Sequence, residues 1–252
     1  MASSTQPWDQ FGELYDRPVY KGRVRGFLLA SQPRSGSHYL GHLLSASGML
    51  GSPLEYFHPG HLQVWKDRLG VETVEQVFDK LFERRTSSSG WFGVKSHWGD
   101  FDAMSAAHPS VIHRLNLEKL IWIKRRDLVD QSVSMVIAQQ TGRWISFQPE
   151  TAFTPQYDFQ AISDARSAIE SEIGAWENYF IEHAVTPIAV YYEDLARDPA
   201  LELRKIYAAF GLEPVNAVSD FPLPGKQASS LNRDWKMRYL AENGEAPRVR
   251  NA

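Results

Sequence analysis

The sequence predicts a three-layer α/β domain with a mainly parallel central sheet flanked by helices. Four short apolar segments of strand length alternate with segments whose apolar residues recur at helical spacing. This alternation is typical of parallel sheets covered by helices. The chain of 252 residues is long enough for one large domain with a substantial core. We expect an N-terminal arm over residues 1–25 and a single domain over residues 26–252.

The expected elements follow the arm in order. The predicted strands are the apolar run that begins at Gly26 and residues 91–95, 119–124 and 187–192. The predicted helices are a first one that ends near residue 47, followed by residues 71–85, 127–140, 164–183 and 198–211. Asp127 and Asp198 are suitable N-caps, and Pro199 suits a first helical turn. Residues 145–160 are rich in prolines and turn residues and predict a long loop, a common form of active-site lid.

The composition excludes several classes of site. The absence of cysteine excludes disulfides, thiolate metal sites and a cysteine nucleophile. A net charge of −3 means that any basic site must be local. No apolar window is long enough to span a bilayer, and the first 25 residues contain no apolar stretch of signal-peptide length. We therefore expect a cytoplasmic protein with no membrane span and no nucleic-acid partner.

A short polar loop, Pro33-Arg34-Ser35-Gly36-Ser37, joins the first predicted strand to the first helix. The first turn of a helix presents unpaired N–H groups and partial positive charge. Gly36 lets a ligand approach the backbone, and Arg34 adds a permanent charge. These parts predict an anion-binding cradle, with a plain strand–helix turn as the alternative. The loop is not a Walker A motif, because it is shorter and has arginine in place of lysine.

A second candidate anion site follows the third predicted strand. Arg126 stands at the strand end, and Ser134 lies two turns into the following helix. Open α/β sheets bind ligands at the carboxyl ends of their strands. An arginine and a hydroxyl that converge there would bind an anion. The alternative is a solvated basic strand end with a surface serine.

Together these residues resemble the sulfotransferase superfamily, which uses 3′-phosphoadenosine-5′-phosphosulfate (PAPS). The loop matches the family's 5′-phosphosulfate loop, and Arg126 with Ser134 has the spacing of its 3′-phosphate pair. The Tyr-Glu-Asp-Leu stretch at 192–195 and the Asp-Trp-Lys stretch at 234–236 are also similar. The closest resemblance is to the bacterial trehalose 2-sulfotransferase-like family. Its motifs occur in order at residues 31–37, 55–57, 93–95, 125–127, 140–144 and 231–232.

The resemblance implies a P-loop-like sulfotransferase fold, PAPS as co-substrate with its bisphosphate PAP as product, no metal, and a homodimer. The residues that it assigns to PAPS binding are Pro33, Arg34, Ser35, Gly36, Ser37, His38, Arg126, Ser134, Tyr192, Lys226 and Gln227. Two positions depart from the family pattern. His38 stands where most family loops have a hydroxyl, and Lys226-Gln227 stands where a stronger basic pair is usual.

Sulfuryl transfer needs a base for the acceptor hydroxyl and cationic groups for the leaving oxygen. Arg34 and Lys95 are the candidate cations. Glu55 matches the carboxylate that is the base in the trehalose-sulfating branch, and its apolar neighbours predict a raised pKa. His97 lies in a Lys-Ser-His run that resembles the Lys-Thr-His of animal cytosolic sulfotransferases, where histidine is the base. We favour Glu55 as the base, with His97 as the alternative or as a substrate ligand.

The predicted acceptor is a small carbohydrate or a glycolipid head group such as trehalose. This prediction depends on aromatic residues in or near two expected specificity loops, 57–70 and 145–160. The candidate substrate-binding residues are Glu55, Tyr56, Trp98 and Trp144. Two alternatives stay open: sulfation of a non-sugar alcohol or phenol, and a non-catalytic nucleotide-binding module.

Overall fold

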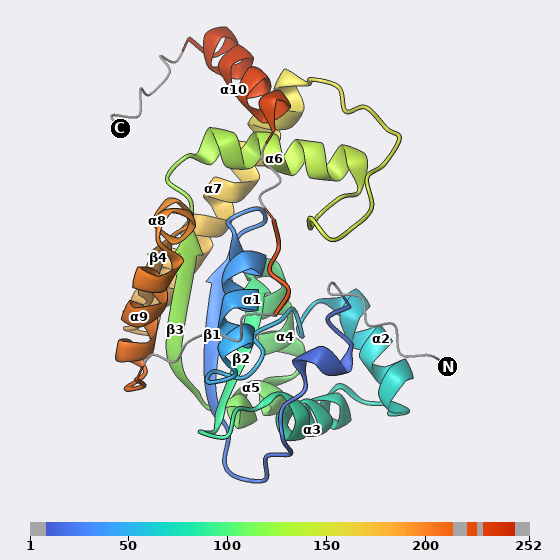
Figure 1. Cartoon of the computed structure of the whole chain (residues 1–252), viewed down its shortest axis with the longest axis vertical. Helices are drawn as coiled ribbons and strands as arrows, with labels where there is room; N and C mark the ends of the chain where they lie inside the picture. The colour runs from blue at the N-terminus through green and yellow to red at the C-terminus, as the bar shows by residue number, and fades with distance from the viewer. Residues whose placement is uncertain (1–8, 214–220, 226–228, 245–252) are drawn as a thin grey trace.

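A computed structural model describes residues 9–213, 221–225 and 229–244 of the chain (Figure 1). Its strands form a four-stranded, all-parallel sheet in the order β2-β1-β3-β4. The strands are β1 (Arg25–Ser31), β2 (Trp91–His97), β3 (Leu117–Lys124) and β4 (Ile188–Tyr191). The predicted α/β class and the parallel sheet are confirmed.

The described helices cover both faces of the sheet and extend beyond its carboxyl edge (Figure 1). They are α1 (Ser37–Ser47), α2 (Pro59–Leu69), α3 (Val74–Arg85), α4 (Trp98–Ala107), α5 (Pro109–Leu115), α6 (Leu128–Thr141), α7 (Phe159–Glu182), α8 (Tyr192–Arg197), α9 (Pro199–Ala209) and α10 (Ser230–Glu242). The predicted caps form, because Asp127 accepts from the N–H of Asp130 at 3.0 Å and Asp198 from that of Leu201 at 2.9 Å. Within this part of the chain, no helix is long and apolar enough to cross a membrane.

The prediction of a loop over residues 57–70 is wrong, because α2 fills most of that segment. Pro59 and Gly60 resemble a turn in the sequence, yet proline is tolerated in the first turn of a helix, where its missing N–H has no partner to lose. Gly70 ends the helix in the left-handed conformation with a φ of 63°. A helix therefore forms this side of the candidate site.

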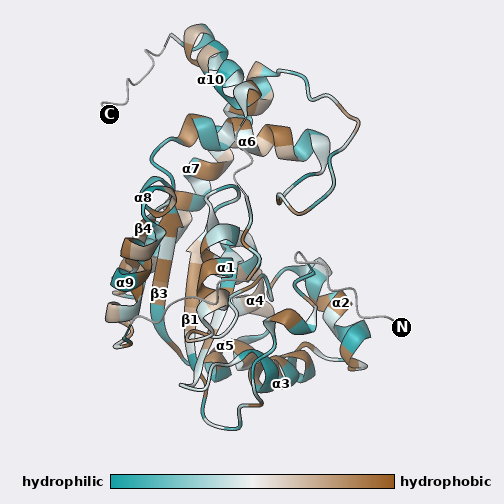
Figure 2. Ribbon diagram, viewed as in Figure 1, coloured by the Kyte–Doolittle hydropathy of each residue, from teal (hydrophilic) through white to brown (hydrophobic). Residues whose placement is uncertain are grey.

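The apolar core lies on the two faces of the central strand β1. Phe27 and Leu29 pack with buried residues of α1 and α9 on one face. Leu28 and Ala30 pack with α3, α4 and α7 on the other, as the alternation of side chains along a strand requires. Figure 2 shows hydrophobic residues along β1 and β3. A smaller cluster joins α6, α7 and α10 beyond the sheet.

The topology brings four strand ends to one edge of the sheet. Because all strands are parallel, the loop after β1, the end of β2, residues 125–127 after β3 and Tyr192 after β4 lie along that edge. The segment before β1 packs against α3, where the N–H of Arg17 donates to the Arg84 carbonyl at 2.6 Å. The same segment also contacts α2, because Asp9 pairs with Arg68 at 3.1 Å.

Gly26 tests the packing of β1. An alanine Cβ at this position would overlap the backbone carbonyl of Leu115, so we expect Gly26→Ala to lower the free energy of unfolding by about 2 kcal/mol. Gly174→Ala in α7 is the matched control, because its Cβ would meet nothing within 4 Å and alanine favours a helix interior. Urea unfolding at pH 7 measures both variants. Equal stability of the two would contradict this account of β1.

Candidate active site

The loop between β1 and α1 has the geometry of the predicted cradle. Gly36 is the N-cap of α1, with a φ of 91°. A Cβ at Gly36 would overlap the ring of Tyr192, so both the backbone conformation and the close approach require glycine. Within the described residues, the buried Ser35 hydroxyl has no hydrogen-bond partner. The loop thus begins the first turn of α1, approaches Tyr192 at Gly36, and contains a buried hydroxyl that has no partner among the described residues.

A cleft of about 900 Å³ lies in front of this loop, at the carboxyl edge of the sheet. Its volume is near the upper end of the range for small-molecule sites. The predicted site residues that line it are Pro33, Arg34, Gly36, Ser37, His38, Glu55, Lys95, His97, Ser134, Trp144 and Tyr192. Segments that are far apart in the sequence therefore meet around one space.

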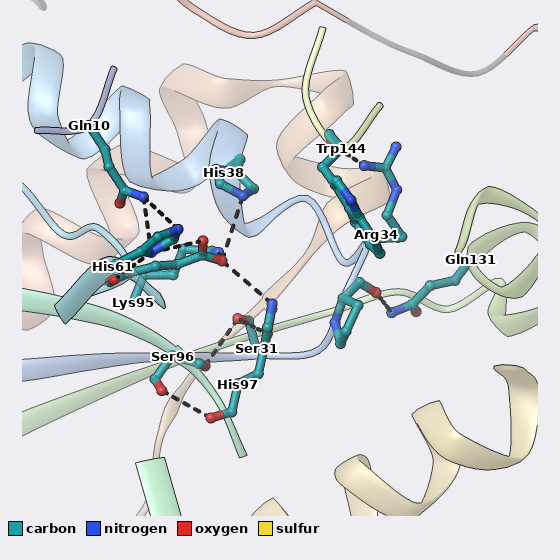
Figure 3. A network of polar contacts seen from close by, with 12 residues as sticks. Gln10, Ser31, Arg34, His38, His61, Lys95, Ser96, His97, Gln131 and Trp144 are labelled. Atoms are coloured by element: carbon teal, nitrogen blue, oxygen red, sulfur yellow. Dashed lines mark hydrogen bonds and ion pairs between the residues drawn. The ribbon is translucent and has the colours of Figure 1, made fainter. Parts of the chain in front are cut away.

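Arg34 connects the cradle to α6 and to the loop that follows α6 (Figure 3). Its Nε donates to the Ser134 hydroxyl at 3.0 Å, and its Nη1 donates to the Trp144 carbonyl. Gln131 in turn donates from Nε2 to the Pro33 carbonyl at 2.7 Å. Burial, aided by the nearby Arg125, lowers the pKa of Arg34 to about 10, so its guanidinium is charged at neutral pH.

His38, Lys95 and His97 form a compact polar cluster on the other side of the cleft (Figure 3), and each of them contacts Glu55. Oε1 of Glu55 pairs with the ammonium of Lys95, a side chain that is only 1% exposed. The same oxygen lies 3.6 Å from Nε2 of His38 and 3.6 Å from Nε2 of His97. Among the described residues, no group of three or more acidic or histidine side chains is arranged to hold a metal ion. The cluster thus joins one carboxylate to one ammonium and two imidazoles.

The prediction of a raised pKa for Glu55 is wrong. Burial alone would raise this pKa, but the Lys95 ammonium, with His38 and His97, holds it well below its usual value. The sequence showed the apolar neighbours of Glu55 but not the lysine, which is 40 residues away along the chain. Glu55 is consequently ionised at neutral pH.

The hydrogen bonds of His97 fix its tautomer. The Ser31 hydroxyl donates to the Ser96 carbonyl at 3.1 Å, so it must accept from Nδ1 of His97, also at 3.1 Å. Nε2 of His97 then carries a lone pair on the side of Glu55. Burial lowers the pKa of His97 to about 4, so the ring is neutral at pH 7. A hydroxyl placed between the Glu55 carboxylate and Nε2 of His97 would have two acceptors for its proton.

Arg126 does not line the cleft. Its half-exposed guanidinium pairs with Asp194 at 2.6 Å and lies 4.0 Å from the ring centre of Tyr191. Its neighbour Arg125 is the arginine that lines the cleft, 4.6 Å from the ring centre of Tyr192. The sequence pattern could not tell which of two consecutive arginines faces the site, and 3′-phosphate binding by Arg126 stays a prediction.

Two predicted acceptor-binding residues, Tyr56 and Trp98, do not line the cleft. Tyr56 is fully buried, and its hydroxyl donates to the Ser52 carbonyl at 2.6 Å. Trp98 packs edge-on against Trp176, with ring centres 5.1 Å apart. Neither residue lines the cleft, so acceptor binding by Tyr56 and Trp98 stays a prediction. Trp144 does line the cleft and is 39% exposed.

Two predicted PAPS-binding residues fall outside the described part of the chain, and several residues that were not predicted line the cleft. Lys226 and Gln227 lie outside the described residues. Residues that line the cleft without having been predicted include Asp9, Gln10, Phe11, His58, His61, Arg68 and Arg125. No sequence motif marks the first six, because their role depends on the arm and α2 packing beside Glu55.

Comparison with known families gives a decisive match. The family model for Stf0 sulphotransferases matches residues 104–242, more than half of the chain. This chain belongs to the Stf0 sulfotransferase family. The sequence is 26% identical to the trehalose 2-sulfotransferase of Mycobacterium tuberculosis, over 90% of this chain and 97% of that protein. It is 24% identical to the trehalose 2-sulfotransferase of Mycolicibacterium smegmatis, over 84% and 93% of the two chains.

The chain is also similar to solved structures. One is the sulfotransferase domain of the Synechococcus PCC 7002 olefin synthase, with a TM-score of 0.47 and 16% identity over 92% of this chain and 98% of that one. Another is a mouse sulfotransferase in complex with PAP, with a TM-score of 0.44 and 18% identity over 98% and 75% of the two chains. Family membership makes this chain an enzyme of the sulfotransferase class.

Removal of the ion pair between Lys95 and Glu55 should lower the stability of the protein. Lys95→Met leaves a buried carboxylate without its partner, so we expect the free energy of unfolding at pH 7 to fall by about 3–5 kcal/mol. The double variant Lys95→Met/Glu55→Gln removes both charges and should recover most of the loss. Urea unfolding measures all three proteins.

The pH dependence of the stability of Lys95→Met tests the direction of the Glu55 pKa shift. In the wild type the Glu55 pKa is lowered on folding, so its contribution to stability is lost as the pH falls through the folded-state pKa. In Lys95→Met, burial raises that pKa, so the variant gains relative stability as the pH falls. We expect the stability difference to narrow from pH 7 to pH 5. A constant difference would contradict the buried-pair account.

Proposed function

We propose that this sulfotransferase transfers the sulfuryl group of PAPS to a hydroxyl of a small polyhydroxylated acceptor, such as a carbohydrate or a glycolipid head group. The proposal depends on the residues that line one cleft. An anion cradle with Arg34 occupies one part, and an ionised Glu55 beside a neutral His97 occupies another. Trehalose is the acceptor named for both curated relatives, which makes it the first compound to test.

The cradle suits a phosphosulfate. We expect the first-turn N–H groups of α1, the Ser37 hydroxyl and the Arg34 guanidinium to contact anionic oxygens in the cleft, with Arg34 oriented by its bonds to Ser134 and the Trp144 carbonyl. Tyr192 packs against Gly36 and presents a ring to the cleft that suits an adenine. Bound PAPS supplies the sulfuryl group and a stable bisphosphate leaving group. Arg34 and the α1 N–H groups would stabilise the charge that develops on that leaving group.

Lys95 would couple donor binding to the basicity of Glu55. An ammonium has three N–H donors, so Lys95 can contact Glu55 and an anionic sulfuryl oxygen at the same time. When its charge is shared with the donor, the pKa of Glu55 rises and the carboxylate becomes a better base. In the free enzyme the ion pair keeps Glu55 ionised and ready to accept a proton.

His97 would assist the base rather than replace it. Its Nε2 lone pair lies 3.6 Å from Glu55 Oε1, so an acceptor hydroxyl between them can be oriented by both. His38 lies at the same distance from Glu55 and belongs to the first turn of α1. It would connect the donor cradle to the base, in the position where related loops carry a hydroxyl.

Ligand-induced stabilisation tests the donor assignment. We expect PAP to raise the melting temperature of the protein, because the cradle binds the bisphosphate. ATP with Mg²⁺ should not raise it, because the loop lacks the Walker lysine that binds a triphosphate. A PAP-saturated protein at a hundred times Kd should gain about 2.7 kcal/mol of stability. Thermal shift measurements with PAP, ATP-Mg and AMP make the comparison. An equal response to ATP-Mg would contradict the proposal.

Substitution of the two candidate bases tests the mechanism. We expect Glu55→Gln to lower kcat at least 100-fold, because a general base contributes about 10²–10⁴ to the rate. His97→Gln should lower kcat about tenfold or less while PAP binding is kept. Turnover of labelled PAPS at pH 7.5 measures both. Near-normal turnover by Glu55→Gln, together with loss of activity in His97→Gln, would transfer the role of base to His97.

A further inference from the structure

One wall of the cleft, next to Glu55, is made by residues outside the sheet and its connecting loops. Asp9, Gln10 and Phe11 of the segment before β1 line the cleft, together with His61 and Arg68 of α2. This wall contains an amide, an imidazole, a guanidinium and a carboxylate. None of them is needed for the donor cradle or for the base described above.

Hydrogen bonds fix the orientation of two of these groups (Figure 3). Nδ1 of His61 lies 3.0 Å from the backbone carbonyl oxygen of Glu55, which can only accept, so Nδ1 carries the proton. Nε2 of His61 is then an acceptor for the Gln10 amide nitrogen, which lies 3.2 Å from Nε2 and 3.0 Å from the protonated Nδ1. Burial lowers the pKa of His61, which keeps the ring neutral. With its nitrogen committed to His61, the Gln10 amide offers its oxygen as an acceptor.

The outer part of the wall is a charged pair on an aromatic base. Arg68 Nη2 lies 3.1 Å from Asp9 Oδ2, and the Arg68 side chain is 47% exposed. Its guanidinium lies 5.2 Å from the ring centre of Phe11. The Phe11 ring meets His61 edge-on, with ring centres 5.6 Å apart. Arg68 therefore has N–H groups available to a ligand while its position is fixed by two neighbours.

We propose that Gln10, His61 and Arg68 form an acceptor subsite that binds hydroxyls next to the one that is sulfated. This inference rests on the proposed function and specifies its acceptor class. Oriented donors and acceptors favour a polyol with several neighbouring hydroxyls. A simple phenol or alcohol would bury these polar groups without partners, at a cost in affinity.

The attachment of the segment before β1 supports this role. Arg85 is 1% exposed, donates to the carbonyl oxygens of Gln10 at 3.3 Å and Gly12 at 3.0 Å, and pairs with Asp16 at 2.7 Å. A buried arginine thus fixes the backbone on both sides of Phe11. The arm is therefore a fixed part of the cleft wall, and Gln10 lies beside His61.

The test measures polyol binding to the full-length protein saturated with PAP, a complex that cannot turn over. Isothermal titration with trehalose, glucose and myo-inositol is carried out on the wild type, Gln10→Ala and Gln63→Ala. Gln63 is the matched control, because it lies on α2 with its amide bonded to Asp67 at 2.9 Å and is exposed away from the cleft. A second variant, His61→Phe, keeps the ring but removes its hydrogen bonds.

We expect the wild type and Gln63→Ala to bind at least one polyol equally well. Gln10→Ala and His61→Phe should weaken that binding about tenfold, the loss of one well-placed hydrogen bond, and keep the affinity for PAP within twofold. Wild-type polyol affinity in Gln10→Ala would overturn the inference. So would equal losses of PAP and polyol affinity in the variants, or a PAP-bound wild type that binds no polyol. Failure of the wild type to bind PAP would instead contradict the proposed function.

Discussion

The buried ammonium of Lys95 requires an anionic partner, and the position of Glu55 follows from that requirement. The backbone brings the two together, because the Lys95 N–H donates to the Leu54 carbonyl at 2.9 Å and Leu54 forms an isolated bridge with Val94 of β2. The ion pair keeps Glu55 ionised in a site where burial alone would raise its pKa. His38 and His97 stay neutral beside it because burial and the Lys95 charge lower their pKa values. A cluster with one ionised carboxylate and neutral imidazoles is suited to accept a proton from a hydroxyl.

The order of the strands then places this cluster next to the anion cradle. β1 lies between β2 and β3, so the loop that carries Arg34 has the Lys95 strand on one side and the Arg125 segment on the other. Helix α6 holds the loop through Gln131, and Arg125 donates to the Arg34 carbonyl at 3.3 Å. In this arrangement, a donor in the cradle and a hydroxyl beside Glu55 would meet across a short space. The chemistry depends on the parallel topology as much as on the individual residues.

Much of this could be predicted from the sequence, because strand periodicity and the loop at 33–37 are local signals. The assignment of Glu55 and His97 to one site came from the resemblance to known sulfotransferases, and the structure does bring them together. Predictions failed where long-range packing decides the outcome. The lowered pKa of Glu55, for example, needs Lys95 nearby. The polar wall formed by the arm and α2 left no signal, because it exists only when two separate segments pack together.

The most direct measurement of the central claim is the fate of the labelled sulfuryl group of PAPS. The purified protein is incubated with ³⁵S-labelled PAPS and either trehalose or 4-nitrophenol, and the labelled products and released PAP are quantified. The account predicts a labelled sulfate ester of the polyol, formed with one PAP for each ester and much faster than any phenol ester. A labelled phenol ester with no polyol ester, or no transfer to either acceptor, would contradict it.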